Sequence, residues 1–215
     1  MTVYPEVERE EFVSLDRLAR ELKTVEGVAA DYATFSGMGE PSLASNLGEA
    51  IRLVKSVLKL PVAVLTNSSL IPREDVRREL SLADVVVAKI DAPAEELFSK
   101  INRPIGSQTL AVILKALQLF REEYHGKLAL QMMFIEANRG YAVDMAKIAE
   151  HLSPDEVQIN TPLRPCGVSP LSPAELVAIG QEFSNFQNVF TVYGALKPEV
   201  IPFDLAETLR RRPKL

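Results

Sequence analysis

The residues best suited to chemistry lie in one short loop, Gly37-Met38-Gly39-Glu40-Pro41, directly after the apolar segment Tyr32–Phe35. The two glycines permit a sharp turn and a close approach to a ligand that a Cβ would block. Pro41 lacks an N–H group and favours an extended conformation at Glu40. Carbonyl oxygens and one carboxylate on a rigid loop suit a cation such as an ammonium group. The same string also fits an ordinary strand-to-helix turn, because short glycine motifs are weak evidence alone.

More polar residues follow other apolar segments that read as buried strands. In parallel sheets, open or closed, ligands bind at the carboxyl edge, where all the strands end. These residues are therefore further candidates for ligand binding. They are Thr66 and Asn67 after residues 61–65, Lys89 and Asp91 after 84–88, and Asn160 at the end of 157–160. Asp91 could instead cap the helix that follows it.

The remaining reactive side chains favour structural interpretations. Cys166 is the single cysteine of the chain, and a free thiol is the simplest interpretation of it. His125 and His151 stand near the ends of expected helices, where a cation interacts favourably with the helix dipole. No metal ligands are predicted, and no catalytic residue can be assigned.

Helix and strand patterns alternate along the chain and predict an α/β fold with a parallel sheet and outer helices. We expect five to six strands, curled rather than flat, with Phe35, Leu65, Val87 and Ile159 inside. The expected strands end near residues 35, 65, 88, 135 and 160. The expected helices follow Ser14, Asn46, Pro72, Glu95, Ser107, Tyr141 and Ser172. Capping boxes are predicted at Asn46 with Glu49 and at Ser172 with Glu175.

The composition bounds the class of protein. The chain has 215 residues, of which 47% are hydrophobic, and a net charge of −5. No apolar run approaches the roughly 18 residues of a membrane span, and no secretory signal is visible. A single cysteine fits a reducing cytoplasm. The negative charge does not support binding of nucleic acid, and the sequence leaves the oligomeric state open.

Six stretches, in order and at matching spacing over roughly residues 10–165, resemble the radical S-adenosylmethionine (radical SAM) superfamily. The subgroup that the chain resembles most is the Fe–S oxidoreductases related to wyosine-tRNA and molybdenum-cofactor biosynthesis enzymes. The stretches are Phe35–Pro41, Val62–Asn67, Lys89–Ala92, Lys100–Pro104, Phe120–Glu123 and Val157–Thr161.

The resemblance implies a partial (β/α)6 TIM-like barrel. It implies that a [4Fe–4S] cluster cleaves S-adenosylmethionine to a 5′-deoxyadenosyl radical, which takes hydrogen from an unknown substrate. It also implies cofactor-binding roles. Gly37, Met38, Gly39, Glu40 and Pro41 would hold the methionine ammonium, and Thr66 and Asn67 would lie near the methionine carboxylate or the substrate. Lys89 and Asp91 stand where relatives contact the ribose or carboxylate, and Asn160 would border the adenine.

One part of the family pattern is absent from this sequence. The three cluster ligands, spaced Cys-x3-Cys-x2-Cys after the first barrel strand, would precede Met1, and so would that strand. Tyr4–Val13 resembles the segment that follows the cysteine loop. We therefore expect residues 1–195 to form an incomplete radical SAM domain, with 196–215 as a tail or the start of a small helical segment.

Three explanations stay open: a fragment of a longer enzyme, a start codon assigned too far downstream, or a cluster-free homologue. The first two make the chain the core of a radical SAM enzyme, inactive as given and with no bound cofactor. The third makes it a non-catalytic binding scaffold.

Overall fold

The computed structural model describes residues 8–36, 39–106, 108–195 and 206. Its centre is a six-stranded sheet in the order β1-β2-β3-β4-β5-β6, and every neighbouring pair is parallel. The strands are β1 (Ala33–Phe35), β2 (Val62–Thr66), β3 (Val85–Lys89), β4 (Lys127–Met133), β5 (Glu156–Asn160) and β6 (Val189–Thr191). The predicted α/β fold with a parallel sheet is therefore confirmed.

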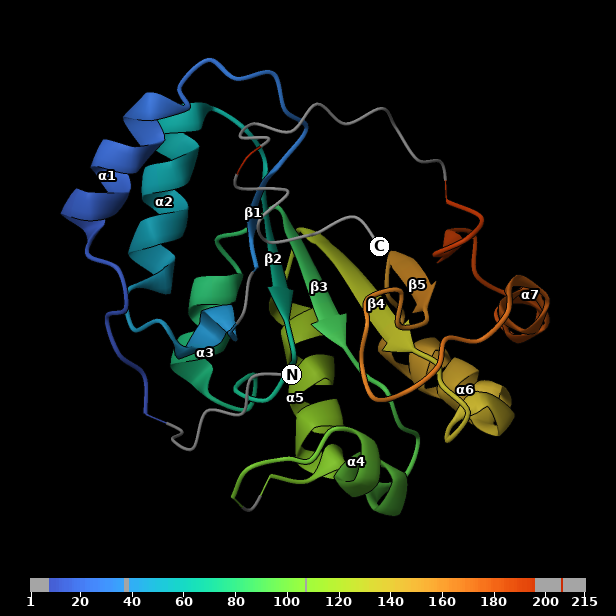
Figure 1. The fold of residues 1–215 in the computed structure, drawn as a ribbon. Coiled ribbons are helices and arrows are strands. Elements are labelled where there is room, and N and C mark those ends of the chain that lie inside the picture. The colour runs from blue at the N-terminus through green and yellow to red at the C-terminus, as the bar shows by residue number, and fades with distance from the viewer. Residues whose placement is uncertain (1–7, 37–38, 107, 196–205, 207–215) are drawn as a thin grey trace.

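Helices connect the strands and surround the sheet on its outer side (Figure 1). They are α1 (Leu15–Thr24), α2 (Leu47–Leu58), α3 (Glu74–Leu80), α4 (Glu95–Ile101), α5 (Leu110–Glu123), α6 (Ala142–Leu152) and α7 (Pro173–Gln181). Two short 3-10 helices, η1 (Pro41–Leu43) and η2 (Arg139–Tyr141), lie after β1 and before α6. Among the described residues, no helix is both long enough and apolar enough to cross a membrane.

Local sequence explains several helix starts. The Ser172 hydroxyl accepts the Glu175 N–H, and the Glu175 carboxylate accepts the Ser172 N–H, so the predicted capping box forms at α7. The capping box predicted at Asn46 is wrong. Asn46 precedes α2, but its side-chain amide donates to the Val13 carbonyl at 2.9 Å, which ties α2 to the segment before α1.

The two faces of the sheet differ in character because successive residues of a strand point to opposite sides. One face, which we call the outer face, packs into the helix-covered core. Its side chains are almost all fully buried, and they include Val64, Val86, Leu130 and Ile159.

The opposite, inner face is more polar and more open. It carries Leu65 and Val87, which are paired in register, together with polar residues of β3, β4 and β5. The four residues expected inside the sheet are therefore divided: Leu65 and Val87 lie on the inner face, whereas Phe35 and Ile159 lie on the outer face.

Candidate functional site

The Glu40 carboxylate fastens the glycine loop to the end of β2. Its Oε1 atom accepts hydrogen bonds from the Ser42 N–H (3.1 Å), the Ser42 hydroxyl (2.7 Å) and the Thr66 hydroxyl (2.6 Å). Its Oε2 atom accepts the Asn67 N–H at 2.6 Å. Glu40 thus joins two of the predicted binding segments, and most of its acceptor capacity serves the protein itself.

Gly39 is exposed beside this carboxylate, whereas Gly37 and Met38 lie outside the described residues. Pro41 begins η1, a position for which its fixed φ is suited. Among the described residues of this loop, the exposed Gly39 is therefore better able to offer an acceptor to a ligand than the engaged Glu40 side chain.

Arg9 supports the turn that follows Glu40, a role that the sequence analysis did not predict. The Arg9 side chain is only 7% exposed. Its guanidinium donates to the Ser42 carbonyl (2.9 Å) and the Ala44 carbonyl (2.5 Å), the two carbonyls that flank Leu43 in the turn after Glu40. It also pairs with Asp75 (3.0 Å) and with Glu79 of α3.

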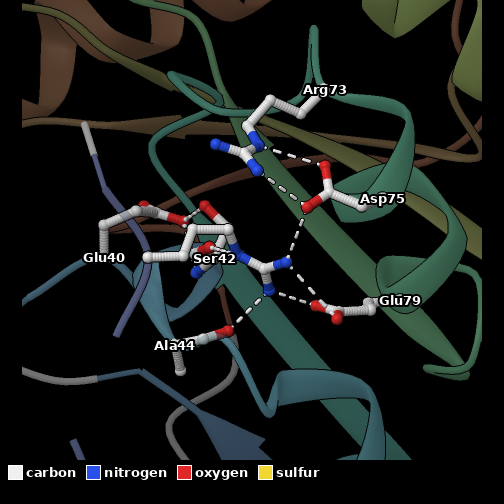
Figure 2. A network of polar contacts seen from close by, with 7 residues as sticks. Glu40, Ser42, Ala44, Arg73, Asp75 and Glu79 are labelled. Carbon is white, nitrogen blue, oxygen red and sulfur yellow. Dashed lines mark hydrogen bonds and ion pairs between the residues drawn. The ribbon is translucent and has the colours of Figure 1, made fainter. Parts of the chain in front are cut away.

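Figure 2 shows this arrangement. The carbonyls of Ser42 and Ala44 lie on one side of the Arg9 guanidinium, and the carboxylates of Asp75 and Glu79 lie on the other. Arg73 also pairs with Asp75, at 2.9 Å. The hydrogen bond from Arg73 holds the pKa of Asp75 well below its usual value, against the effect of burial and with help from Arg9. Because the contacts of Arg9 join residues 33 to 70 positions apart, no local pattern in the sequence could have revealed them.

Lys89 and Asp91 form a second polar group at the end of β3. The Asp91 side chain is 1% exposed and the Lys89 side chain 30%. Asp91 Oδ2 accepts from Lys89 Nζ (2.5 Å) and from the Asn102 amide (3.0 Å), and Oδ1 accepts the Met133 N–H (2.9 Å). Asp91 does not cap α4, whose N-cap is Ala94. It binds the ends of β3 and β4 together and positions the Lys89 ammonium.

Asn138 completes this group and was not expected from sequence. Its buried side-chain amide donates to the carbonyls of Asp91 (2.8 Å) and Met133 (2.9 Å), and its oxygen accepts the Ile135 N–H (2.7 Å). All of its visible partners are backbone groups. Asn138 therefore shapes the loop after β4.

The predicted site residues fall into two groups and one separate residue along a single edge of the sheet. Glu40, Thr66 and Asn67 contact one another, and Lys89 contacts Asp91. Asn160 ends β5, is partly exposed, and is paired in register with Met133. Since all strands are parallel, their carboxyl ends share one edge.

The residues present do not fit a [4Fe–4S] cluster. Such clusters are held by cysteine thiolates, and the chain contains one cysteine. Cys166 is exposed on the loop after β5, where its thiol donates to the Val168 carbonyl at 3.3 Å. Within the described residues, no group of three or more His, Cys, Asp or Glu side chains is placed to hold a metal ion.

Comparison with known proteins identifies the family. The family model described as "Radical SAM superfamily" matches residues 3–149. A UPF0026 protein of Methanocaldococcus jannaschii is 31% identical over 195 residues, which cover 87% of this chain and 60% of that protein. A UPF0026 protein of Synechocystis sp. is 36% identical over 159 residues, which cover 74% of this chain and 60% of that protein. The chain thus spans about 60% of the length of these relatives.

Solved structures share the fold at low sequence identity. Native anSMEcpe with bound AdoMet matches with a TM-score of 0.62 at 19% identity, covering 85% of this chain and 56% of that one. Streptococcus suis SuiB bound to S-adenosylmethionine gives 0.62 at 15%, covering 80% and 42%. TYW1 with a lysine-pyruvate adduct gives 0.62 at 16%, covering 80% and 60%. At these identities the likeness to the three structures concerns the fold.

Together, the family match over most of the chain and the parallel sheet with its polar carboxyl edge confirm the resemblance seen in the sequence. This chain belongs to the radical SAM superfamily.

Proposed function

We propose that this chain is the S-adenosylmethionine-binding core of a radical SAM enzyme that acts on an unknown substrate. What supports the proposal most is that Glu40 fastens the glycine loop to the end of β2 at the carboxyl edge of a parallel sheet. That edge is where ligands bind in such folds. The three thiolates of the cluster must come from outside this chain, so the chain alone is inactive.

In this proposal, residues at the ends of different strands bind different parts of S-adenosylmethionine. Backbone carbonyls of the loop at residues 37–39 accept hydrogen bonds from the methionine ammonium. Thr66 and Asn67 line the place of its carboxylate. The Lys89 ammonium, which pairs with Asp91, offers a hydrogen-bond donor near the ribose or carboxylate. Asn160 borders the adenine. Each assignment extends the family pattern to a residue of this chain.

Binding of S-adenosylmethionine tests the proposal. The chain as given should bind it weakly or undetectably, because the cluster normally holds the methionine amine and carboxylate. A chain extended at its N-terminus with a Cys-x3-Cys-x2-Cys loop, and loaded anaerobically with iron and sulfide, should bind it in a calorimetric titration. Gly39→Val should abolish that binding, since a branched side chain would obstruct the loop backbone.

His151→Ala is the matched control. His151 is exposed in the last turn of α6, where its ring contacts Gln118 of α5 at 3.2 Å. Its removal should leave binding unchanged. If the Gly39→Val variant binds as well as its parent, the cofactor does not occupy this loop. A cluster-free scaffold, the alternative function, would gain no affinity from the extension.

A further inference from the structure

The inner face of the sheet carries a row of polar side chains, of which the proposed cofactor contacts use only Lys89. Gln131 of β4 is paired in register with Lys89 of β3 on one side and with Gln158 of β5 on the other. These three side chains therefore form a row across three strands, and all are partly exposed. We call Glu156, Gln158 and Gln131 the amide strip.

The hydrogen bonds of the amide strip have a fixed direction. Glu156 Oε2 pairs with Lys127 Nζ at 2.5 Å, and Glu156 Oε1 accepts from Gln158 Nε2 at 2.7 Å. An ionised carboxylate only accepts hydrogen bonds, so Gln158 must turn its NH2 group toward Glu156. The Gln158 oxygen then faces Gln131 and accepts from Gln131 Nε2 at 3.1 Å.

These hydrogen bonds also determine which atom of the Gln131 amide faces away from Gln158. The oxygen and nitrogen of a glutamine amide are usually interchangeable in a structure, but the Glu156 anchor removes that freedom here. Gln131 must present its Oε1 atom away from Gln158. Among the described residues, none donates a hydrogen bond to this oxygen, and the Gln131 residue is partly exposed.

Lys89 places a donor beside this acceptor. Neighbouring strands lie about 4.8 Å apart, and Lys89 and Gln131 are direct neighbours on the same face. The Lys89 ammonium gives one hydrogen bond to Asp91 and has three N–H groups in all. Because Asp91 balances Lys89 and Glu156 balances Lys127, the region has a donor and an acceptor but little net charge.

We propose that Lys89 and Gln131 bind a neutral amide group of the substrate. The amide carbonyl accepts from the Lys89 ammonium, and the amide N–H donates to Gln131 Oε1. A carboxylate would bring a second acceptor against Gln131 Oε1 and would gain little from a lysine already paired with Asp91. This inference rests on the proposed function, because it names the substrate class for the inner face of the same sheet.

Titration of the chain as it exists tests the inference with three small probes of one shape. Benzamide offers an acceptor and a donor, methyl benzoate offers only acceptors, and benzoate is an anion. In nitrogen-15 NMR spectra, benzamide should shift the side-chain amide signals of Gln131 and Gln158 in a saturable manner. Benzoate and methyl benzoate should bind about tenfold more weakly, as expected for one lost hydrogen bond.

Three variants separate recognition from simple packing. Gln131→Met keeps the length of the side chain and should remove the preference for benzamide. Glu156→Gln frees the amide strip to reverse, so that Gln131 can present N–H, and the ratio of benzamide to benzoate affinity should fall toward one. Gln181→Met, on the exposed end of α7, is the control and should change neither affinity.

The inference is overturned if benzamide does not shift the two glutamine signals, if benzoate binds equally well, or if Glu156→Gln keeps the parent ratio. Thermal unfolding of each variant confirms that it is folded before titration. These measurements need neither the cluster nor S-adenosylmethionine. Failure of the extended protein to bind that cofactor would overturn the proposed function alone, and failure of the titrations would overturn only the amide site.

Discussion

At the scale of single residues, Glu40 can act as a support for the loop or as a direct ligand, and one substitution separates these roles. Glu40→Gln keeps the shape but turns its NH2 group either toward the Asn67 N–H or toward the donors of Ser42 and Thr66. We expect the free energy of unfolding of the chain as given to fall by about 2 kcal/mol, measured by urea denaturation.

Glu49→Gln is the matched control, because Glu49 is exposed in the first turn of α2. We expect it to change the stability by less than about 0.5 kcal/mol. If Glu40→Gln proves equally harmless, the four hydrogen bonds contribute little to folding, and a direct role in ligand binding becomes the better explanation for Glu40.

At the scale of elements, Arg9 joins the segment before α1 to η1 and α3. Arg9→Met leaves the carbonyls of Ser42 and Ala44 without their donor and the Glu79 carboxylate without its partner. Breaking a fully buried pair costs about 3–5 kcal/mol, and the partly exposed carboxylates here reduce the expected loss to about 2 kcal/mol. Arg78→Met, on the exposed side of α3, should cost far less in the same urea denaturation.

Acid should narrow the difference between Arg9→Met and its parent. Asp75 has a pKa lowered in the folded state by Arg73 first, against burial, and then by Arg9. A lowered folded-state pKa gives stability that is fully present above the ordinary value of 3.8 and is lost as the pH falls through the folded-state value. A difference in unfolding free energy that stays constant from neutral pH to below 3.8 would show that Arg9 acts through packing rather than charge.

Local patterns explain which elements could be predicted. Five strands and seven helices carry strong apolar periodicity or a start signal such as Ser172-Pro173, so they were found close to their observed bounds. β6 has only the three residues Val189–Thr191 and gives no comparable signal. The role of Asp91 was not visible either, because its partners Asn102 and Met133 lie 11 and 42 residues away.

At the scale of the whole molecule, we expect that this chain by itself binds no iron. Only one thiolate is available, so the chain incubated anaerobically with iron and sulfide should stay colourless, without cluster absorption near about 400 nm. A Cys166→Ser variant should behave in the same way. Brown protein with stoichiometric iron and sulfide would show that the ligand assignment is wrong.

The central claim is that the sheet edge assembled here serves radical SAM chemistry once cluster cysteines are supplied. The most direct measurement is the amount of 5′-deoxyadenosine, determined by chromatography after anaerobic incubation with S-adenosylmethionine and a strong reductant. The chain extended with the Cys-x3-Cys-x2-Cys loop and loaded with cluster should form it, whereas its Gly39→Val variant and the chain as given should form none. A fully loaded extended chain that forms no 5′-deoxyadenosine, or formation by the chain as given, would contradict the account.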